Sequence, residues 1–393
     1  MKKRRVILRI FPFNRITFPV LLRSWETRRI DSAFEVVISQ QRPRPRPDDV
    51  ILYSFMTPFL PLIAAEIQAI NRPDIIIAAG GPHATGDQEL TRRIGFDIIF
   101  IGEGEQNFID FGRDLREGNI AKEFRIYQPP SRSVMSRYLP LSRYLKTIPP
   151  LELTRGCPRR CRFCATSRIP AAQRDYPSVI RYMDALRGKG VERINFITSG
   201  NLSRQAVVSV IEAARARAFA FIEFGIFPSE IRPERIEEKL LTYLRKRVSN
   251  RSLTIGAQSG ASSRLKSLGR DHEPREVIRS VGLINQAGFR ANVDFIIGTP
   301  GETPAEFNRT LDFIRCLKKK FRVTVQVHFF FPLPGTPLGF ARPRFLDPSQ
   351  RTILQQAGSD GLITGGWQKN EQQSAAYLEW LGRRHPDYHH RFG

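Results

Sequence analysis

Short apolar runs, many of them rich in β-branched residues, recur through the first 115 residues and are separated by stretches with helical spacing. A run that is apolar at nearly every position is typical of a strand buried on both faces of a parallel sheet. Such strands, alternating with crossover helices over 58–71 and 87–94, predict a doubly wound α/β domain over residues 1–116. The predicted strands cover residues 6–11, 34–39, 50–54, 75–79 and 98–102.

A second alternation begins near residue 150. Its predicted strands are 151–154, 193–198, 219–224, 252–257, 290–297 and 323–331, and its predicted helices are 177–187, 204–217, 233–245, 275–286 and 304–319. These β/α units predict a second α/β domain over residues 149–340, with a site at the carboxyl ends of its strands. We expect residues 117–148 to be a linker and residues 341–393 a C-terminal extension that packs on this domain or covers its mouth.

The composition is that of a soluble globular protein, with 41% hydrophobic residues in a chain of 393. No apolar run approaches the roughly 18 residues that a membrane span needs, so we expect none. The basic start of the chain lacks the apolar segment of a signal peptide. Because the chain has only four cysteines, we expect it in a reducing compartment, the cytoplasm.

The charge is strongly positive, with 62 basic and 38 acidic residues and a net charge of +24. Such an excess attracts polyanions and favours contact with nucleic acid. A general preference for arginine on solvated surfaces would give the same balance, because the basic residues are spread along the chain. The sequence therefore leaves an RNA partner open.

Cys157, Cys161 and Cys164 form a C-x₃-C-x₂-C cluster within eight residues. Three thiolates can hold three irons of a [4Fe–4S] cluster and leave the fourth iron without a protein ligand. An open coordination position of this kind distinguishes a catalytic metal centre from a closed structural one. A disulfide framework is disfavoured by the low cysteine count. A zinc site would need a fourth ligand, and none of the six histidines is close in sequence.

This cysteine spacing, with Phe163 just before the third cysteine, resembles the radical SAM superfamily. The resemblance implies an open partial (β/α)6 barrel in which the free iron binds the amine and carboxylate of S-adenosylmethionine (SAM). It further implies reductive cleavage of SAM to methionine and a 5′-deoxyadenosyl radical. A reducing electron donor such as flavodoxin or ferredoxin is then expected as a partner.

Further segments resemble the SAM-binding motifs of this superfamily. Thr198-Ser199-Gly200-Asn201 stands where many members have a GGE-like loop for the amino group, but it lacks the glutamate. Backbone carbonyls or the Ser and Asn side chains would then recognise the amine. In simpler interpretations Gly298 forms a turn, Asp294 caps a helix and Arg270 is a surface cation. The SAM contacts implied by the resemblance are Phe163, Thr198, Ser199, Gly200, Gln258, Ser259, Arg270, Asp294 and Gly298.

Two glycine-containing loops in the first domain, with Ser54 at the end of its third predicted strand, resemble the cobalamin-binding, Rossmann-like domain of cobalamin-dependent radical SAM enzymes. The D-x-H-x-x-G motif, whose histidine ligates cobalt in other cobalamin proteins, is missing. Two alternatives stay open: a domain that binds cobalamin, and one that contacts substrate or a partner. The implied cobalamin contacts are Ser54, Gly80, Gly81, Pro82, His83, Gly102, Glu103 and Gly104.

The sequence leaves three candidate functions open. The first is a radical SAM enzyme acting on a small molecule, with cobalamin-dependent methyl transfer to an unactivated carbon. The second is a cobalamin-independent radical SAM enzyme that modifies RNA; methylthiolation is disfavoured, because four cysteines cannot hold a second three-cysteine cluster. The third is a basic nucleic-acid-binding protein with a structural cluster.

Arginines surround the cysteine cluster in the sequence. Cations near an iron–sulfur cluster stabilise its reduced, more negative form. They would equally bind the SAM carboxylate, the acidic face of an electron donor or an anionic substrate, and the sequence does not choose among these roles. The segment 227–233 also resembles the family, without a role for any of its residues. The arginines in question are Arg155, Arg159, Arg160, Arg162, Arg168 and Arg174.

Overall fold

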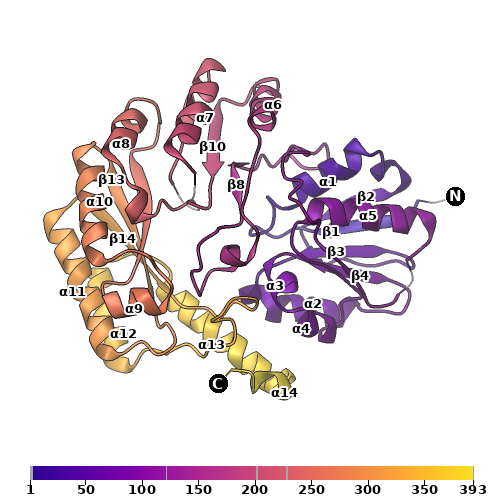
Figure 1. The fold of residues 1–393 in the computed structure, drawn as a ribbon. Helices are drawn as coiled ribbons and strands as arrows, with labels where there is room; N and C mark the ends of the chain where they lie inside the picture. Colours follow the sequence, from indigo (N-terminus) through magenta and orange to yellow (C-terminus); the bar gives the residue numbers. More distant parts are fainter. Residues whose placement is uncertain (1–2, 121, 201, 227–228, 393) are drawn as a thin grey trace. The chain divides into compact units, whose positions relative to one another are not determined.

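A computed structural model describes residues 3–120, 122–200, 202–226 and 229–392. The chain divides into two compact units, shown as ribbons in Figure 1. Unit 1 consists of Met1–Pro149 together with Leu333–Gly335, and unit 2 consists of Pro150–Pro332 together with Thr336–Gly393.

Unit 1 is built on a parallel sheet of six strands in the order β2-β1-β3-β4-β5-β6. The strands are β1 (Arg5–Arg9), β2 (Glu35–Ser39), β3 (Val50–Ser54), β4 (Ile76–Gly80), β5 (Ile98–Phe100) and β6 (Arg125–Tyr127). The chain moves from β1 outward to β2 and then returns to the other side of β1 with β3. In open α/β sheets such a reversal places a ligand crevice beyond the carboxyl ends of the strands.

Helices cover both faces of this sheet. The pair α1 (Phe18–Thr27) and α5 (Gly104–Glu117) packs on one face, and α2 (Leu60–Ile70) lies with α4 (Gln88–Arg93) on the other (Figure 1). A short helix, α3 (Pro82–Gly86), follows β4 directly. All residues of β3 are buried, as the apolar pattern predicts for a strand covered on both sides.

Unit 2 has two parallel three-stranded sheets, β11-β10-β7 and β12-β13-β14. A single parallel bridge between Ile231 and Ile255 joins the segment after β11 to β12. The result is a row of parallel strands in the order of the predicted β/α units. The strands are β7 (Leu151–Glu152), β10 (Arg193–Ile197), β11 (Phe221–Glu223), β12 (Ser252–Gln258), β13 (Arg290–Ile297) and β14 (Val323–Phe329), and a small antiparallel pair is formed by β8 (Thr154–Arg155) and β9 (Ala172–Gln173).

Amphipathic helices connect these strands, and the predicted α/β fold class is confirmed. Within the described part of unit 2 the helices are α6 (Tyr176–Arg187), α7 (Arg204–Ala216), α8 (Glu238–Arg245), α9 (Ser262–Ser267), α10 (Pro274–Gln286), α11 (Pro304–Lys320), α12 (Pro348–Ser359), α13 (Trp367–Arg384) and α14 (Pro386–His389). The helix expected over 233–245 begins only at Glu238, because Ile236 and Glu237 have extended backbone conformations.

One segment differs from the expected organisation. The strand β6 lies inside the segment 117–148 that we expected to be a loose linker, and it forms the sheet edge beside β5. The polar extension 341–393 contains two substantial helices, α12 and α13, and α13 packs against β14. Thr364 adds a parallel bridge to Gln326 of β14. No helix in the described ranges is both long and apolar enough to cross a membrane.

Candidate functional site

The three clustered cysteines lie on one loop that follows the short strands β7 and β8. Gly156 starts the loop with a φ of +68°, and a Cβ there would collide with the backbone carbonyl groups of Ile169 and Pro170. The hydroxyl of Ser167 donates to the carbonyl oxygens of Cys161 (3.0 Å) and Cys164 (2.6 Å). Cys161 is buried, while the other two thiols are half-buried.

The cysteine loop is held against the rest of unit 2 by backbone and apolar contacts. The Arg162 N–H donates to the carbonyl of Leu268 (3.0 Å), and the Arg162 carbonyl accepts from the Leu338 N–H (3.1 Å). Phe163, predicted to contact SAM, packs against a cluster that contains Leu268, Phe330 and Leu338. In this structure its ring therefore anchors the loop.

Two guanidinium groups reach the thiol of Cys161, and both come from outside the loop. Arg232 Nη1 lies 3.6 Å from Cys161 Sγ, and Arg270 Nη1 lies 3.7 Å from the same sulfur. Arg270 also donates through Nη2 to the carbonyl of Gly256 (2.7 Å) near the end of β12. The predicted site residue Arg270 thus lies at the cysteine loop and not on the open surface.

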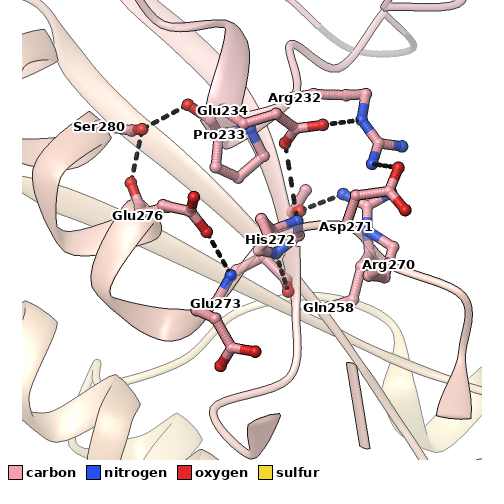
Figure 2. A network of polar contacts seen from close by, with 12 residues as sticks. Arg232, Pro233, Glu234, Gln258, Arg270, Asp271, His272, Glu273, Glu276 and Ser280 are labelled. Atoms are coloured by element: carbon pink, nitrogen blue, oxygen red, sulfur yellow. Dashed lines mark hydrogen bonds and ion pairs between the residues drawn. The ribbon is translucent and has the colours of Figure 1, made fainter. Parts of the chain in front are cut away.

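Acidic side chains fix Arg232 in place, as Figure 2 shows. Its Nε donates to Glu234, and its Nη2 lies 3.4 Å from Asp271, which also pairs with Arg159 at 2.7 Å. Burial is the largest single influence on the Glu234 carboxyl and opposes its charge, but the hydrogen bond and the charge of Arg232, with smaller contributions, together leave its pKa below the usual value. Both members of the Arg232–Glu234 pair are therefore charged.

His272 lies next to Glu234 in this network (Figure 2). Its Nε2 lies 3.1 Å from the carbonyl oxygen of Ala257, and its Nδ1 lies 3.8 Å from Glu234 Oε2. Burial and the nearby charge of Arg270 lower the pKa of the imidazole. At neutral pH His272 is thus a neutral donor to the backbone at the end of β12.

Glu230 and Asp294 form a carboxyl pair in the same site. Asp294, on β13, is 3% exposed, and burial followed by the charge and hydrogen bond of Glu230 raises its pKa to about 8. The amide of Gln258 donates to Glu230 Oε2 at 3.3 Å. Gln258 has a φ of +66° where the β12–β13 register shifts, a strained conformation of the kind that clusters at functional sites.

The loop after β10 lies next to Cys157. The sulfur of Cys157 is 3.8 Å from the carbonyl oxygen of Ser199, and Ser199 Oγ lies 3.0 Å from Thr154 Oγ1. Thr198 is bonded instead to Ser229, with its N–H donating to Ser229 Oγ at 2.9 Å. Gly200 turns the chain with a φ of +73°, and Asn201 lies outside the described residues.

Two predicted SAM contacts have roles within the fold. Ser259 is fully buried, and its hydroxyl lies 3.1 Å from that of Thr310 on α11. Gly298 has a φ of +70°, and a Cβ there would overlap the ring of Phe329. Its N–H donates to the buried carboxyl of Glu302 (2.6 Å), whose pKa burial raises to about 7.

The residues of unit 2 fit a cluster and a polar ligand beside it. Among the described residues, the buried polar atoms without a partner include Gln258 Oε1, Arg270 Nε and Asp294 Oδ1, and such atoms are costly unless a ligand or water satisfies them. No three His, Cys, Asp or Glu side chains in the described ranges converge on a single metal ion. A cluster does not require such convergence, because its thiolates bind different irons.

Sequence reasoning missed Glu230, Arg232 and His272 as site residues. Glu230 and Arg232 lie in the segment 227–233 that resembled the family without an assigned role, and residues 227 and 228 fall outside the described part of the chain. Arg232 meets a cysteine that precedes it by 71 positions. A contact of that separation leaves no local signal in a single sequence.

In unit 1, three predicted cobalamin contacts lie at the carboxyl ends of the adjacent strands β3 and β4. Ser54 pairs in register with Gly80, and Gly81 follows with a φ of +93°. A Cβ on Gly81 would come within 2.9 Å of Ser54 Oγ and within 2.8 Å of the Phe55 nitrogen. The turn therefore requires glycine, which leaves bare backbone at the strand ends, as a close-fitting ligand needs.

The remaining predicted cobalamin contacts do not form one open surface. Pro82 is exposed, but His83 is fully buried; its Nδ1 lies 3.1 Å from Thr57 Oγ1, and burial lowers its pKa to about 3. Its Nε2 has no partner in the structure. Glu103 accepts from the Val134 N–H (2.9 Å).

Gly102 and Gly104 lie on the loop between β5 and α5. A Cβ on Gly102 would come within 2.9 Å of Pro129, and Gly104 is the first residue of α5. The segment expected to be a linker therefore lies against this loop. Gly102 is exposed, whereas Gly80 and Gly81 on the loop after β4 are half-buried.

Comparisons with known proteins agree with this two-part organisation. Residues 151–314 match the family model of the radical SAM superfamily, and residues 38–111 match that of the B12 binding domain. An uncharacterized protein of Methanocaldococcus jannaschii is 24% identical over 68% of this chain and 62% of its own length. An uncharacterized methyltransferase of Pyrococcus horikoshii is 24% identical over 70% of this chain and 64% of its own length. The chain thus spans somewhat less than two thirds of these relatives.

Two solved structures share the fold across both units. One is TsrM from Kitasatospora setae, a radical S-adenosylmethionine methyltransferase with cobalamin and a [4Fe-4S] cluster bound; it has a TM-score of 0.60, is 16% identical, and the match covers 86% of this chain and 77% of TsrM. The other is the cobalamin-dependent S-adenosylmethionine radical enzyme OxsB, with a TM-score of 0.61, 15% identity, and coverage of 97% of this chain and 66% of OxsB. The chain thus carries a radical SAM domain over residues 151–314, preceded by a B12 binding domain over residues 38–111.

Proposed function

We propose that this protein is an enzyme that reductively cleaves SAM at a [4Fe–4S] cluster held by Cys157, Cys161 and Cys164. The observation that carries the proposal is the connected polar site beside the cysteine loop. Arg270 bridges Cys161 Sγ and the Gly256 carbonyl, and the Gln258, Glu230 and Asp294 side chains continue from there. Unpartnered buried atoms on Gln258, Arg270 and Asp294 have the polarity that a zwitterionic nucleoside ligand requires.

Different side chains of the site would bind different groups of SAM. The guanidinium of Arg270 suits a carboxylate, which it can bind through two parallel hydrogen bonds. The Glu230–Asp294 pair and Gln258 offer acceptors for an ammonium group or ribose hydroxyls. Phe330 and Leu338 pack behind Phe163 and keep water from the inner face of the cysteine loop. When bound, the cluster supplies one electron to the sulfonium of SAM, which breaks a carbon–sulfur bond and releases methionine.

We propose further that unit 1 binds cobalamin over the backbone of Ser54, Gly80 and Gly81. The support is the glycine turn, whose Cβ-free surface lies at the strand ends where α/β sheets take their ligands, and the match to the B12 binding domain. Bound cobalamin would carry a methyl group from SAM to an unactivated carbon of a small-molecule substrate. A reducing donor such as flavodoxin or ferredoxin and a cytoplasmic location belong to the same proposal.

RNA as substrate is a second candidate. It is favoured by the net charge of +24 and by curated relatives such as a tRNA-2-methylthio-N(6)-dimethylallyladenosine synthase of Petrotoga mobilis, which is 24% identical over 62% of this chain and 57% of its own length. The fourth cysteine, Cys316, lies on α11 and leaves no second three-cysteine cluster for sulfur insertion.

The proposed SAM site is tested by electron paramagnetic resonance of the anaerobically reconstituted, dithionite-reduced protein. We expect a [4Fe–4S]⁺ signal that changes shape when SAM is added, because SAM occupies the open iron. Arg270→Gln should keep the signal and weaken the SAM-dependent change. A cluster signal that is indifferent to saturating SAM would contradict the proposal and favour a structural cluster.

Methyl transfer is tested separately with SAM, reductant and a library of candidate substrates, with and without added hydroxocobalamin. We expect S-adenosylhomocysteine to form only when cobalamin is present. Gly81→Val, which fills the turn after β4, should abolish the cobalamin absorbance of the purified protein but leave the cluster content unchanged. Cobalamin-independent formation of S-adenosylhomocysteine would contradict this part of the proposal.

A further inference from the structure

The arginines that reach the cysteine sulfur are not those that surround the cysteines in the sequence. Arg155 forms an ion pair with Glu152 at 2.7 Å, and Arg159 forms one with Asp271 at 2.7 Å. Arg232 and Arg270, from the segments after β11 and α9, are the residues whose guanidinium nitrogens approach Cys161 Sγ. The two have different surroundings.

Arg232 is fixed far more tightly than a surface cation. Its side chain is 8% exposed, its Nε is bonded to Glu234, and its Nη2 lies 3.4 Å from Asp271. This leaves Nη1 directed at the sulfur of Cys161, which is itself only 5% exposed (Figure 2 shows the guanidinium and its acidic partners). Arg270, in contrast, has an unpartnered Nε and is the arginine that suits the SAM carboxylate.

We propose that Arg232 is a dedicated tuning residue, which raises the reduction potential of the cluster by donating a charged hydrogen bond to the Cys161 thiolate. This inference rests on the proposed function only in requiring that the cluster is bound. The cluster gains one negative charge on reduction, so a fixed cation and N–H donor at a ligand sulfur stabilise the reduced form more than the oxidised form. Burial strengthens the effect, because the pair is little screened by water.

The acidic partners set the size of this effect. Glu234, with a side chain 18% exposed, is bonded to the same guanidinium and offsets part of its charge. The Arg232–Glu234 pair is therefore neutral overall, and the cluster senses a dipole whose positive end, Arg232, lies nearer the sulfur. Removing Arg232 and removing the charge of Glu234 should shift the potential in opposite directions.

The test is a redox titration of the SAM-free, reconstituted full chain, followed by the [4Fe–4S]⁺ resonance, with iron and sulfide content as the check of cluster loading. Arg232→Gln should give a more negative midpoint potential than the wild type. Arg159→Gln is the matched control: it removes an arginine whose hydrogen bond in the described structure goes to the same Asp271 carboxylate and not to a cysteine sulfur, and it should leave the potential close to the wild-type value.

Two further variants keep the inference testable if Arg232→Gln fails to load a cluster. Arg232→Lys retains the charge and should stay close to the wild-type potential. Glu234→Gln keeps a hydrogen-bond acceptor for Arg232 but removes the compensating charge, and it should make the potential less negative. Opposite shifts in Arg232→Gln and Glu234→Gln would support the inference.

Equal potentials in the wild type, Arg232→Gln and Glu234→Gln would overturn the tuning role while leaving the proposed function intact. Shifts of the same size in Arg232→Gln and Arg159→Gln would also overturn it, because the effect would then come from net charge alone. A wild-type protein that binds iron without any [4Fe–4S]⁺ resonance would contradict the proposed function, and the inference with it.

Discussion

At the scale of single residues, the site combines two kinds of charge. Guanidinium groups approach the cysteine loop, and a carboxyl pair, Glu230 and Asp294, lies farther inside the barrel. Two carboxyl groups in hydrogen-bond contact, here a buried Asp294 and a half-buried Glu230, cannot both be ionised without a large cost. One proton therefore stays on the pair at neutral pH while no ligand is bound, which the raised pKa of Asp294 reflects.

The Glu230–Asp294 pair makes stability depend on pH. In the unfolded chain the Asp294 carboxyl ionises near its ordinary pKa of 3.8, whereas in the folded protein its pKa is raised to about 8. Below the lower value both states are protonated, and between the two values the unfolded state gains stability as the pH rises, by about 1.4 kcal/mol for each unit of pKa difference. We therefore expect the cofactor-free protein to lose stability across this window.

Asp294→Asn should flatten that decline, as measured by denaturant unfolding at a series of pH values. Asp312→Asn is the control, because the Asp312 side chain is 71% exposed. Parallel pH profiles for the wild type and Asp294→Asn would show that the buried carboxyl does not retain its proton.

Site residues that belong to a recognisable sequence motif could be predicted, and site residues outside such motifs could not. Gln258, Arg270 and Asp294 come from short motifs, and the structure places all three beside the cysteine loop or in the adjoining polar site. Arg232 and Glu230 became visible only through contacts across the barrel. His83 and Ser259 come from the same kind of motif, and the structure shows both as fully buried, which the sequence does not reveal.

At the scale of elements, the turn after β13 has a strict backbone requirement. Gly298 and Gly301 both have φ near +70°, but a Cβ on Gly298 would overlap Phe329, and a Cβ on Gly301 meets nothing within 4 Å. The two positions therefore separate backbone strain from steric collision.

Gly301→Ala should cost about 1–2 kcal/mol of unfolding free energy, from the left-handed conformation alone. Gly298→Ala should cost about 1–3 kcal/mol more, because Phe329 must move. Denaturant unfolding of the two variants measures the difference, and equal losses would contradict the collision with Phe329.

In unit 1, β1 and α2 are joined by a buried ion pair between Arg9 and Glu66, with side chains 7% and 10% exposed and a separation of 2.7 Å. Removal of one partner leaves the other charge buried. We expect Glu66→Gln to lower the unfolding free energy by about 3–5 kcal/mol. Glu89→Gln, which breaks the exposed pair with Arg93, should cost only about 0–1 kcal/mol. Chemical unfolding of both variants decides whether burial sets this difference, and similar losses would contradict it.

The strands were easier to predict than the helices. A buried parallel strand is apolar at nearly every position, so β1 to β5 and the long strands of unit 2 are visible in the sequence to within a few residues. The helix α1 was missed although Phe18, Leu22 and Trp25 form one buried face, and α13 was missed because it is polar on most of its surface. The short strand β6 depends on its pairing with β5, which a local pattern cannot show.

At the scale of the whole molecule, the net charge of +24 predicts binding to RNA at low salt. Because counterion release drives such binding, the logarithm of the affinity should fall linearly with the logarithm of the salt concentration. Fluorescence anisotropy with a folded tRNA and an unstructured RNA of equal length measures both slopes. Equal affinities that vanish together at moderate salt would favour a small-molecule substrate, and selective binding of one RNA at high salt would favour RNA modification.

The central claim is that the chain cleaves SAM reductively, and its most direct measurement is the amount of 5′-deoxyadenosine formed under anaerobic conditions with dithionite. The reconstituted wild-type protein should produce 5′-deoxyadenosine and methionine in equal amounts, and Cys161→Ala should produce neither. A wild-type protein with a full complement of reduced [4Fe–4S] cluster that forms no 5′-deoxyadenosine, with or without cobalamin and candidate substrates, would contradict the account.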